Sequence, residues 1–104
     1  MRQEKRLNRR YPVIWELKGK VLRTFEPTGD VPFQVSRDLL GAVSNISAGG
    51  LCLLTDDEPE VSSAVRCEIF VPQVPTGIPT LLQVRWVHKS DDGRTYRLGL
   101  QFLV

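Results

Sequence analysis

Hydrophobic and polar residues alternate one by one along much of the chain. In the first such run, Trp15, Leu17 and Val21 fall on one face and Glu16 and Lys18 fall on the other. A period of two is typical of a β-strand that buries one face. By this pattern we expect six strands, over residues 13–21, 33–43, 51–55, 65–71, 81–89 and 96–102, with the second interrupted near residues 37–41.

The segments between these runs are rich in turn-forming residues. Prolines and glycines mark loops at residues 27–32 and 72–79, and DDG at residues 91–93 is typical of a hairpin turn. DDEPE at residues 56–60 predicts a loop, with one helical turn allowed at Pro59. Short strands of this kind, without an amphipathic helix, favour an all-β fold in which an antiparallel sheet closes into a small barrel or forms a sandwich.

The alternation also predicts which aromatic side chains fill the core. Trp86 falls on the same face of the fifth strand as Leu82, and His88 follows on that face. Tyr96 and Phe102 share one face of the sixth strand. We expect the rings of Trp86, Tyr96 and Phe102, together with Trp15, to lie inside the barrel.

The composition supports a single β-rich domain. A chain of 104 residues can bury one core, and 12 valines against 3 alanines favour pleated structure. The net charge of +2 is too small to indicate nucleic-acid binding. However, residues 1–10 hold five basic residues and one acidic residue, and few apolar ones. We expect a mobile arm over residues 1–12 and a barrel over residues 13–104.

The sequence offers little for catalysis, metal binding or membrane insertion. His88 is the single histidine, and Cys52 and Cys67 sit in apolar strands, where a free thiol behaves as a small hydrophobe. There is no Cys/His cluster with metal-ligand spacing. No apolar run approaches the roughly 18 residues that cross a membrane, and no apolar segment follows the basic N-terminus. We expect a cytoplasmic domain that is not an enzyme.

Two short motifs carry candidate binding chemistry. RLNRR, residues 6–10, places Arg6 and Arg10 four apart, with Arg9 beside the second. Alone, this is typical of a solvated basic tail. NISAGG, residues 45–50, is a polar, glycine-rich turn between two expected strands.

Such a turn has a purely structural interpretation. Asn45 and Ser47 can bond to nearby backbone, and we expect Gly49 and Gly50 to supply positive φ angles. Alone, the motif therefore predicts only a tight turn. An arginine arm before the first strand and an N-x-S-x-x-G turn after the second, in this order, form a more specific combination.

This combination resembles the PilZ domain family, bacterial receptors for cyclic di-GMP, which carry R-x-x-x-R and [D/N]-x-S-x-x-G at these places. The flanking segments RRYPV, GGLCLLTD, VRWV and YRLGLQF are also similar to the family. The resemblance covers essentially the whole chain and implies a six-stranded antiparallel barrel of Greek-key type with cyclic di-GMP as its ligand. The ligand-binding residues that it implies are Arg6, Arg9, Arg10, Asn45, Ser47, Gly49 and Gly50.

The chain departs from the family at two of these places. Many members carry an arginine directly after the proline, where this chain has Val13, so alignment on residues 11 and 12 pairs Arg9 with Val13. Alignment on spacing pairs Arg6 with Arg10 instead, and we favour this register. Asn45 stands where aspartate is usual, which keeps an oxygen acceptor but loses its charge.

The ligand's chemistry suits these residue types. Cyclic di-GMP carries two phosphodiesters and two guanines, and the planar fork of arginine matches either a phosphate or the O6/N7 edge of guanine. We expect the ligand to order the arm against the barrel and so to change the surface offered to a partner protein or tethered domain.

Two alternatives stay open, together with a smaller question about the last hairpin. One is a PilZ-like interaction domain with weak or no ligand binding, and the other is a barrel that binds single-stranded nucleic acid. The latter would spread its basic charge along a groove, whereas residues 11–104 are mildly acidic. We therefore expect no nucleic-acid partner and no membrane insertion. Arg85, Arg94 and Arg97 either extend the ligand site or only aid solubility.

Overall fold

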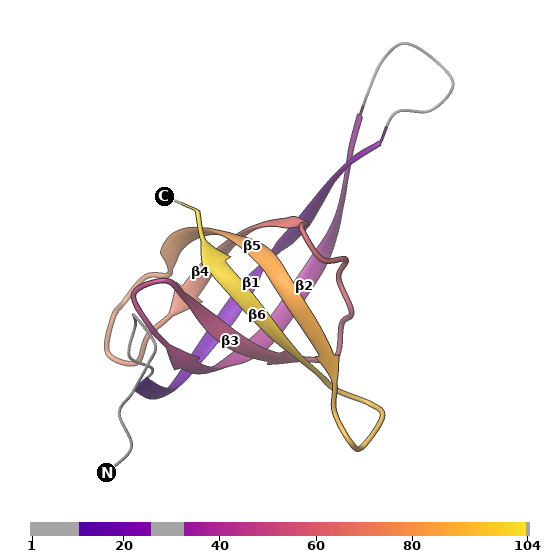
Figure 1. Cartoon of the computed structure of the whole chain (residues 1–104). Coiled ribbons are helices and arrows are strands. Elements are labelled where there is room, and N and C mark those ends of the chain that lie inside the picture. The colour runs from indigo at the N-terminus through magenta and orange to yellow at the C-terminus, as the bar shows by residue number, and fades with distance from the viewer. Residues whose placement is uncertain (1–10, 26–32, 104) are drawn as a thin grey trace.

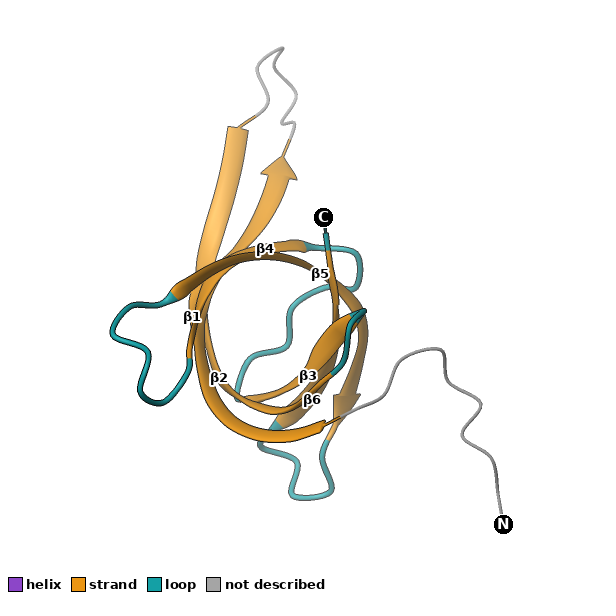
Figure 2. Cartoon of the chain, turned by 90° about the vertical axis from the view of Figure 1, so that its left-hand side faces the viewer, coloured by secondary structure: helices purple, strands orange, loops and turns teal. Residues whose placement is uncertain are grey.

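Six antiparallel strands close into one barrel in the computed structural model, which describes residues 11–25 and 33–103 (Figures 1 and 2). The strands are β1 (Tyr11–Phe25), β2 (Phe33–Ile46), β3 (Gly50–Thr55), β4 (Ala64–Phe70), β5 (Ile78–Lys89) and β6 (Tyr96–Phe102). Their order around the barrel is β1-β2-β3-β6-β5-β4. The described residues contain no helix. The all-β fold expected from the alternation is thus confirmed, and so is the closed six-stranded barrel that the family resemblance implied. The expected mobile arm lies almost entirely outside the described residues.

The connection from β3 to β4 crosses the barrel, because these two strands follow each other in the sequence but are not neighbours in the sheet. β1, β2 and β3 pair in sequence order, and β4 then pairs with β1 on the far side. The returning strand β6 lies between β3 and β5 and pairs with both. Each of the six strands therefore has a hydrogen-bonded neighbour on both sides, which leaves no open sheet edge in the body of the barrel.

The hairpin of β1 and β2 projects beyond the body of the barrel (Figures 1 and 2). β2 runs without a break from Phe33 to Ile46, so the expected interruption near residues 37–41 is wrong. It stays a strand because residues 33–43 pair with β1. The Lys20 ammonium on β1 also donates a hydrogen bond to the Asp38 carboxylate and forms an ion pair with it. In the described part of the projecting hairpin, β1 and β2 form their backbone hydrogen bonds with each other and have no further neighbouring strand.

The core lies inside the barrel and consists of aliphatic side chains from all six strands. The first strand contributes as its alternation predicts, since Leu17 and Val21 are buried while Glu16 and Lys18 are exposed. The side chains with 2% or less of their surface exposed are Leu17, Val21, Leu39, Val43, Leu53, Val65, Leu82, Val84 and Leu98. Removing their apolar surface from water is the main favourable contribution to the fold.

The aromatic residues divide between the core's margin and the outside. Trp15, Tyr96 and Phe102 are half-buried and pack against the aliphatic core. Trp86 is 39% exposed, so its expected place inside the barrel is wrong. The cause is a bulge in β5, because Val84 pairs with Leu100 while Trp86 pairs with the next residue, Gly99. The extra residue, Arg85, reverses the alternation and leaves Trp86 and His88 outside.

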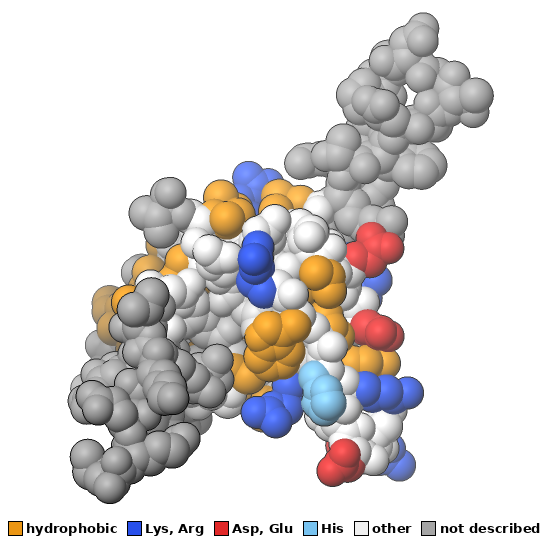
Figure 3. Space-filling view, in the orientation of Figure 1, with side chains coloured by type: hydrophobic (Ala, Val, Ile, Leu, Met, Phe, Trp, Pro, Cys, Tyr) orange, Lys and Arg blue, Asp and Glu red, His pale blue; other side chains and the backbone are white. Residues whose placement is uncertain are grey.

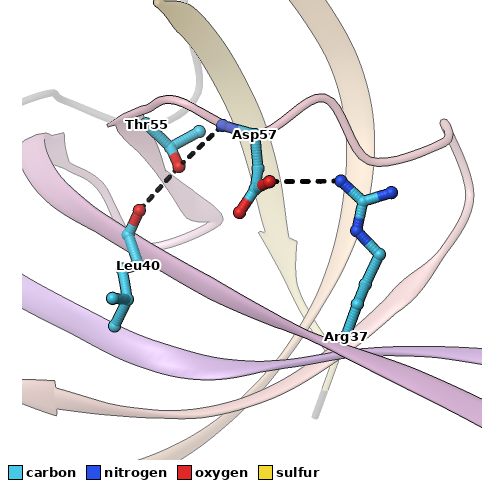
Figure 4. A network of polar contacts seen from close by, with 4 residues as sticks. All are labelled: Arg37, Leu40, Thr55 and Asp57. Atoms are coloured by element: carbon cyan, nitrogen blue, oxygen red, sulfur yellow. Dashed lines mark hydrogen bonds and ion pairs between the residues drawn. The ribbon is translucent and has the colours of Figure 1, made fainter.

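The loops differ from expectation at two places. β5 begins at Ile78, inside the segment expected to be a loop, because Ile78 and Pro79 pair with β4. Residues 56–63 contain no helical turn at Pro59; instead this loop is fixed to β2 at its start (Figure 4). There the buried Thr55 hydroxyl donates to the Leu40 carbonyl at 2.6 Å and accepts from the Asp57 N–H at 3.2 Å.

The expected turn at residues 91–93 is confirmed. Gly93 has a φ of 72°, the left-handed conformation that glycine adopts without a steric penalty. The Asp92 carboxylate accepts hydrogen bonds from the backbone N–H groups of Arg94 at 2.8 Å and Thr95 at 3.1 Å. These contacts lower the pKa of Asp92 because they favour its charged form.

Candidate ligand-binding site

The NISAGG turn and the β5 bulge lie on one line across the barrel. Strand register places five residues side by side on consecutive strands, in the order Pro12, Asn45, Cys52, Gly99 and Trp86. Neighbouring strands are about 4.8 Å apart, so this row brings Asn45 within three strand spacings of Trp86. Residues that are more than 40 positions apart in the sequence therefore share one outer surface.

A hollow of about 290 Å³ opens over this row. Its lining comes from the turn, from the start of β3 and from the bulged part of β5 with the adjoining part of β6: Asn45, Ser47, Gly49, Gly50, Leu51, Cys52, Arg85, Trp86, Gly99, Leu100 and Gln101. Figure 3 shows hydrophobic and basic side chains next to each other over β5 and β6 on this face. The structure thus brings together all four turn residues singled out in the sequence, which are Asn45, Ser47, Gly49 and Gly50.

The turn is held by its own backbone. The Ser47 N–H donates to the Gly50 carbonyl at 2.8 Å, and the Gly49 N–H donates to the Ser47 hydroxyl at 3.3 Å. The Gly49 carbonyl in turn accepts from the Phe102 N–H at 2.9 Å, which ties the turn to β6. The serine therefore has the structural role that the turn chemistry predicts, and it also faces the hollow.

Gly50 is required by a close approach of two strands. A Cβ atom at this position would come within 2.0 Å of the Leu100 carbonyl oxygen on β6. In the described part of the chain, Gly93 is the glycine with a left-handed φ, so the positive φ expected at Gly49 and Gly50 is wrong. Glycine at position 50 instead lets β3 and β6 pair beside the turn without a side chain between them.

Two residues of the site were not predicted correctly from the sequence. The period-two pattern places Trp86 inside the barrel, and it leaves the role of Arg85 open. The bulge puts Arg85 on the rim, where its Nη1 donates to Gln83 Oε1 at 3.3 Å. Trp86 lies flat over Gly99, since a Cβ there would come within 2.1 Å of the indole Nε1. The adjacent glycine in YRLGLQF is the sequence signal that could have revealed an aromatic ring packed on the strand.

Three register shifts fall at the same level of the barrel. β1 is shifted between Pro12 and Trp15, β2 between Val43 and Asn45, and β5 at Arg85. Bulges re-aim side chains and are frequent beside binding sites. The shifts in β2 and β5 adjoin lining residues of the hollow, Asn45 and Arg85, so its outline depends on irregularities in these two strands.

The lining carries one formal charge, that of Arg85, and includes no acidic side chain. Asn45, Ser47 and Gln101 add uncharged polar groups, while Trp86 adds an exposed ring. An arginine, short polar groups and an aromatic ring suit a planar anionic ligand. Arg94 and Arg97 do not line the hollow, and Arg6, Arg9 and Arg10 lie outside the described residues.

Other kinds of site are not evident in the described residues. Within 11–25 and 33–103, no three His, Cys, Asp or Glu side chains gather where they could hold a metal ion. The same residues include no helix long and apolar enough to span a membrane. The two thiols, Cys52 and Cys67, are free and buried.

Comparison with protein families identifies the family to which the chain belongs. The family model described as PilZ domain matches residues 1–104, the whole chain. A search of curated proteins returned no match. The chain belongs to the PilZ domain family.

Proposed function

We propose that this domain binds cyclic di-GMP in the hollow between the NISAGG turn and the β5 bulge. Members of its family are ligand-binding and adaptor modules, and cyclic di-GMP is the ligand for which the family is known. The observation that carries the proposal is the cross-strand row that sets Asn45 beside Cys52, Gly99 and Trp86. The turn residues singled out in the sequence and Arg85 all line the hollow over this row, which supports the proposal.

Each lining group has a matching feature in the ligand. The Arg85 guanidinium can pair with a phosphate or with the O6/N7 edge of a guanine. The exposed Trp86 ring offers a face on which a guanine can stack, an interaction worth about 1–3 kcal/mol per base. Asn45 and Ser47 present short polar groups on the opposite wall.

The N-terminal arginines complete the proposed site. Tyr11, the first residue of β1, pairs with Ile46 inside the NISAGG motif, so the preceding segment joins the barrel beside the hollow. An extended chain gains at most about 3.5 Å per residue, which puts both Arg10 and Arg6 within roughly 20 Å of Tyr11. Arg6, Arg9 and Arg10 can therefore all reach the ligand.

Binding then acts as a switch on the barrel surface. The ligand closes the arginine arm over the hollow, and the closed arm presents a new surface to a partner protein or a tethered domain. Ordering a segment of this length costs about 2–5 kcal/mol, so a moderate affinity is expected.

Isothermal titration of cyclic di-GMP tests the proposal and resolves the arginine register. Arg10→Ala should weaken binding about 5- to 150-fold, and Arg6→Ala should do the same if the spacing register holds. Arg94→Ala, in the distant hairpin turn, is the matched control and should bind like wild type. Full affinity in Arg6→Ala with a loss in Arg9→Ala would select the other register.

The same titration decides between a receptor and a pure interaction domain. The alternative, a PilZ-like domain without ligand binding, rests on Val13 and Asn45, which depart from the family's pattern. Absence of a binding signal at millimolar cyclic di-GMP, with the barrel folded by circular dichroism, would favour that alternative and overturn the proposal.

A further inference from the structure

A second hollow, of about 340 Å³, lies on the outer surface where β1, β2 and β3 run side by side. Four apolar residues line it, the buried Leu17 and the exposed Leu40, Ala42 and Leu54. The charged lining residues are Glu16 and Lys18 on β1 and Asp56 directly after β3. It shares no lining residue with the proposed ligand hollow. We call this surface the β2 face, and it requires an explanation of its own.

The apolar residues of the β2 face are unusually exposed. Leu40 leaves 58% of its surface exposed, and Leu54 leaves 41%. Ala42 pairs with Leu54 across β2 and β3, and Leu40 lies two residues along the same face of β2, so the three form one patch. A contiguous apolar patch beside a hollow, bordered by charge, is typical of a docking surface.

The patch is held in one geometry before anything docks. The Thr55 hydroxyl fixes the Leu40 carbonyl at 2.6 Å, and Arg37 pairs with Asp57 at 3.2 Å. In Figure 4 the Leu40 side chain points away from both Thr55 and Asp57. These contacts fix the segment that carries Asp56 relative to β2, so little ordering cost remains for association.

The two charges directly beside Leu40 are opposite in sign, and Glu16, opposite Ala42, adds a negative charge on the same strand as Lys18. Lys18 pairs with Leu40 across β1 and β2, while Asp56 follows Thr55, which pairs with Gly41 across β2 and β3. Elsewhere on this hairpin and loop, Lys20 pairs with Asp38 and Arg37 with Asp57. Among the described residues, Lys18 and Asp56 have no ion-pair partner, and the Lys18 ammonium instead lies 5.5 Å from the Phe70 ring centroid.

We propose that the β2 face docks onto the β2 face of a second copy of this chain, forming a twofold dimer. A twofold axis along β2 brings Leu40 against Leu40 of the second copy. The same rotation brings Lys18 onto Asp56 of the second copy, and symmetry forms this ion pair twice. An unrelated partner would need an acidic group opposite Lys18 and a basic group opposite Asp56. A second copy, rotated about the twofold axis, presents both groups at these places.

The dimer is weak and reversible. The patch is small beside the roughly 800 Å² per partner of a standard interface, so we expect a Kd between about 10 µM and 1 mM. Because the ligand hollow shares no residue with the β2 face, the dimer does not depend on cyclic di-GMP.

Sedimentation equilibrium of the ligand-free chain, up to about 1 mM, tests the proposal. Wild type should show a monomer–dimer equilibrium, and Leu40→Glu should weaken it at least about tenfold. The matched control is Leu81→Glu, with 43% of Leu81 exposed, on the strand three places around the barrel from β2. A monomeric wild type at 1 mM, or equal effects of the two substitutions, would overturn the proposal.

A charge exchange tests the twofold arrangement without touching the apolar patch. Lys18→Glu alone and Asp56→Lys alone each set like charges against each other and should weaken the dimer. The double variant restores opposite charges and should regain most of the wild-type affinity. Failure of the double variant to recover, with all variants folded by circular dichroism, would rule out this geometry. Dimerisation is read without cyclic di-GMP, so its failure leaves the ligand proposal standing.

Discussion

The indole of Trp86 lies against Gly99 so closely that a Cβ atom at position 99 would come within 2.1 Å of the indole Nε1. The ring belongs to β5 and the glycine to β6, and the two are cross-strand partners only because Arg85 is an extra residue. One bulge therefore sets the exposure of the ring and its place on the proposed ligand hollow.

Gly99→Ala should displace this ring. A methyl group cannot fit under the indole, so Trp86 must swing outward, at a cost of about 1–3 kcal/mol in the free energy of unfolding. In a Trp15→Phe background, Trp86 is the remaining tryptophan, and its emission should shift to longer wavelength. If cyclic di-GMP stacks on this ring, its affinity should fall in the same variant. Unchanged emission would contradict the close packing.

Gly50→Ala should be more damaging than Gly99→Ala. The added Cβ would lie 2.0 Å from a backbone oxygen, that of Leu100, which cannot rotate away as a side chain can. β3 and β6 must then separate, and we expect a loss of at least about 2 kcal/mol. Urea unfolding of the two variants side by side checks the order, and a smaller loss for Gly50→Ala would refute it.

Thr55→Val tests the junction drawn in Figure 4. The change keeps the shape of a buried side chain but removes the hydroxyl that donates to Leu40 and accepts from Asp57. Two backbone groups lose their partner, and the free energy of unfolding should fall by about 1–3 kcal/mol. Thr80→Val is the control, because the exposed Thr80 hydroxyl bonds only to the Ile78 carbonyl. Equal losses in the two variants would show that the Thr55 contacts add nothing.

Cys67 should make the fold less stable at high pH. Burial, with the nearby Glu68 charge, raises the pKa of this thiol from 9.0 to about 11. The folded state holds the thiol proton more tightly than the unfolded state does. The contribution of the protonated thiol to the free energy of unfolding is therefore complete below pH 9 and is lost as the pH rises toward 11. Between pH 8 and pH 10, this contribution to the free energy of unfolding should fall by about 1 kcal/mol.

Denaturant titrations of wild type and Cys67→Ala at both pH values isolate this contribution. All other titratable groups are the same in both proteins, so the difference between the two pH dependences belongs to the thiol. Parallel pH dependences in the two proteins would be inconsistent with a raised thiol pKa. Slow reaction of the native protein with a thiol reagent at neutral pH is expected as well.

The sequence predicted strands well where one face is simply buried. Leu17 and Val21 point inward because residues 15–21 keep the same alternation in the barrel. A turn within residues 45–50 was also predictable, since polar and glycine residues stand there between two apolar runs. The turn itself is shorter than expected, because β2 runs to Ile46 and β3 begins at Gly50. Both features depend on the order of neighbouring residues along the chain, so they can be predicted without knowing which strands pair.

The sequence could not predict features that arise from pairing between distant strands. Nothing in residues 81–89 marks Arg85 as an extra residue, because the bulge is defined by β6 as the partner. The whole of β2 is ordered because it pairs with β1, although Asp38 and Gly41 interrupt its apolar pattern. The place of Trp86 on the candidate site follows from pairing of this kind.

The position of β6 between β3 and β5 has a consequence for how the domain is made. The hollow takes Gly99 and Gln101 from β6, a strand that closes the barrel only after every earlier strand has been synthesised. On the ribosome, the first five strands emerge with two unpaired edges facing each other across the gap that β6 will fill. The hollow can therefore form only once β6 has been synthesised, and the same step closes the two open sheet edges that would otherwise invite aggregation.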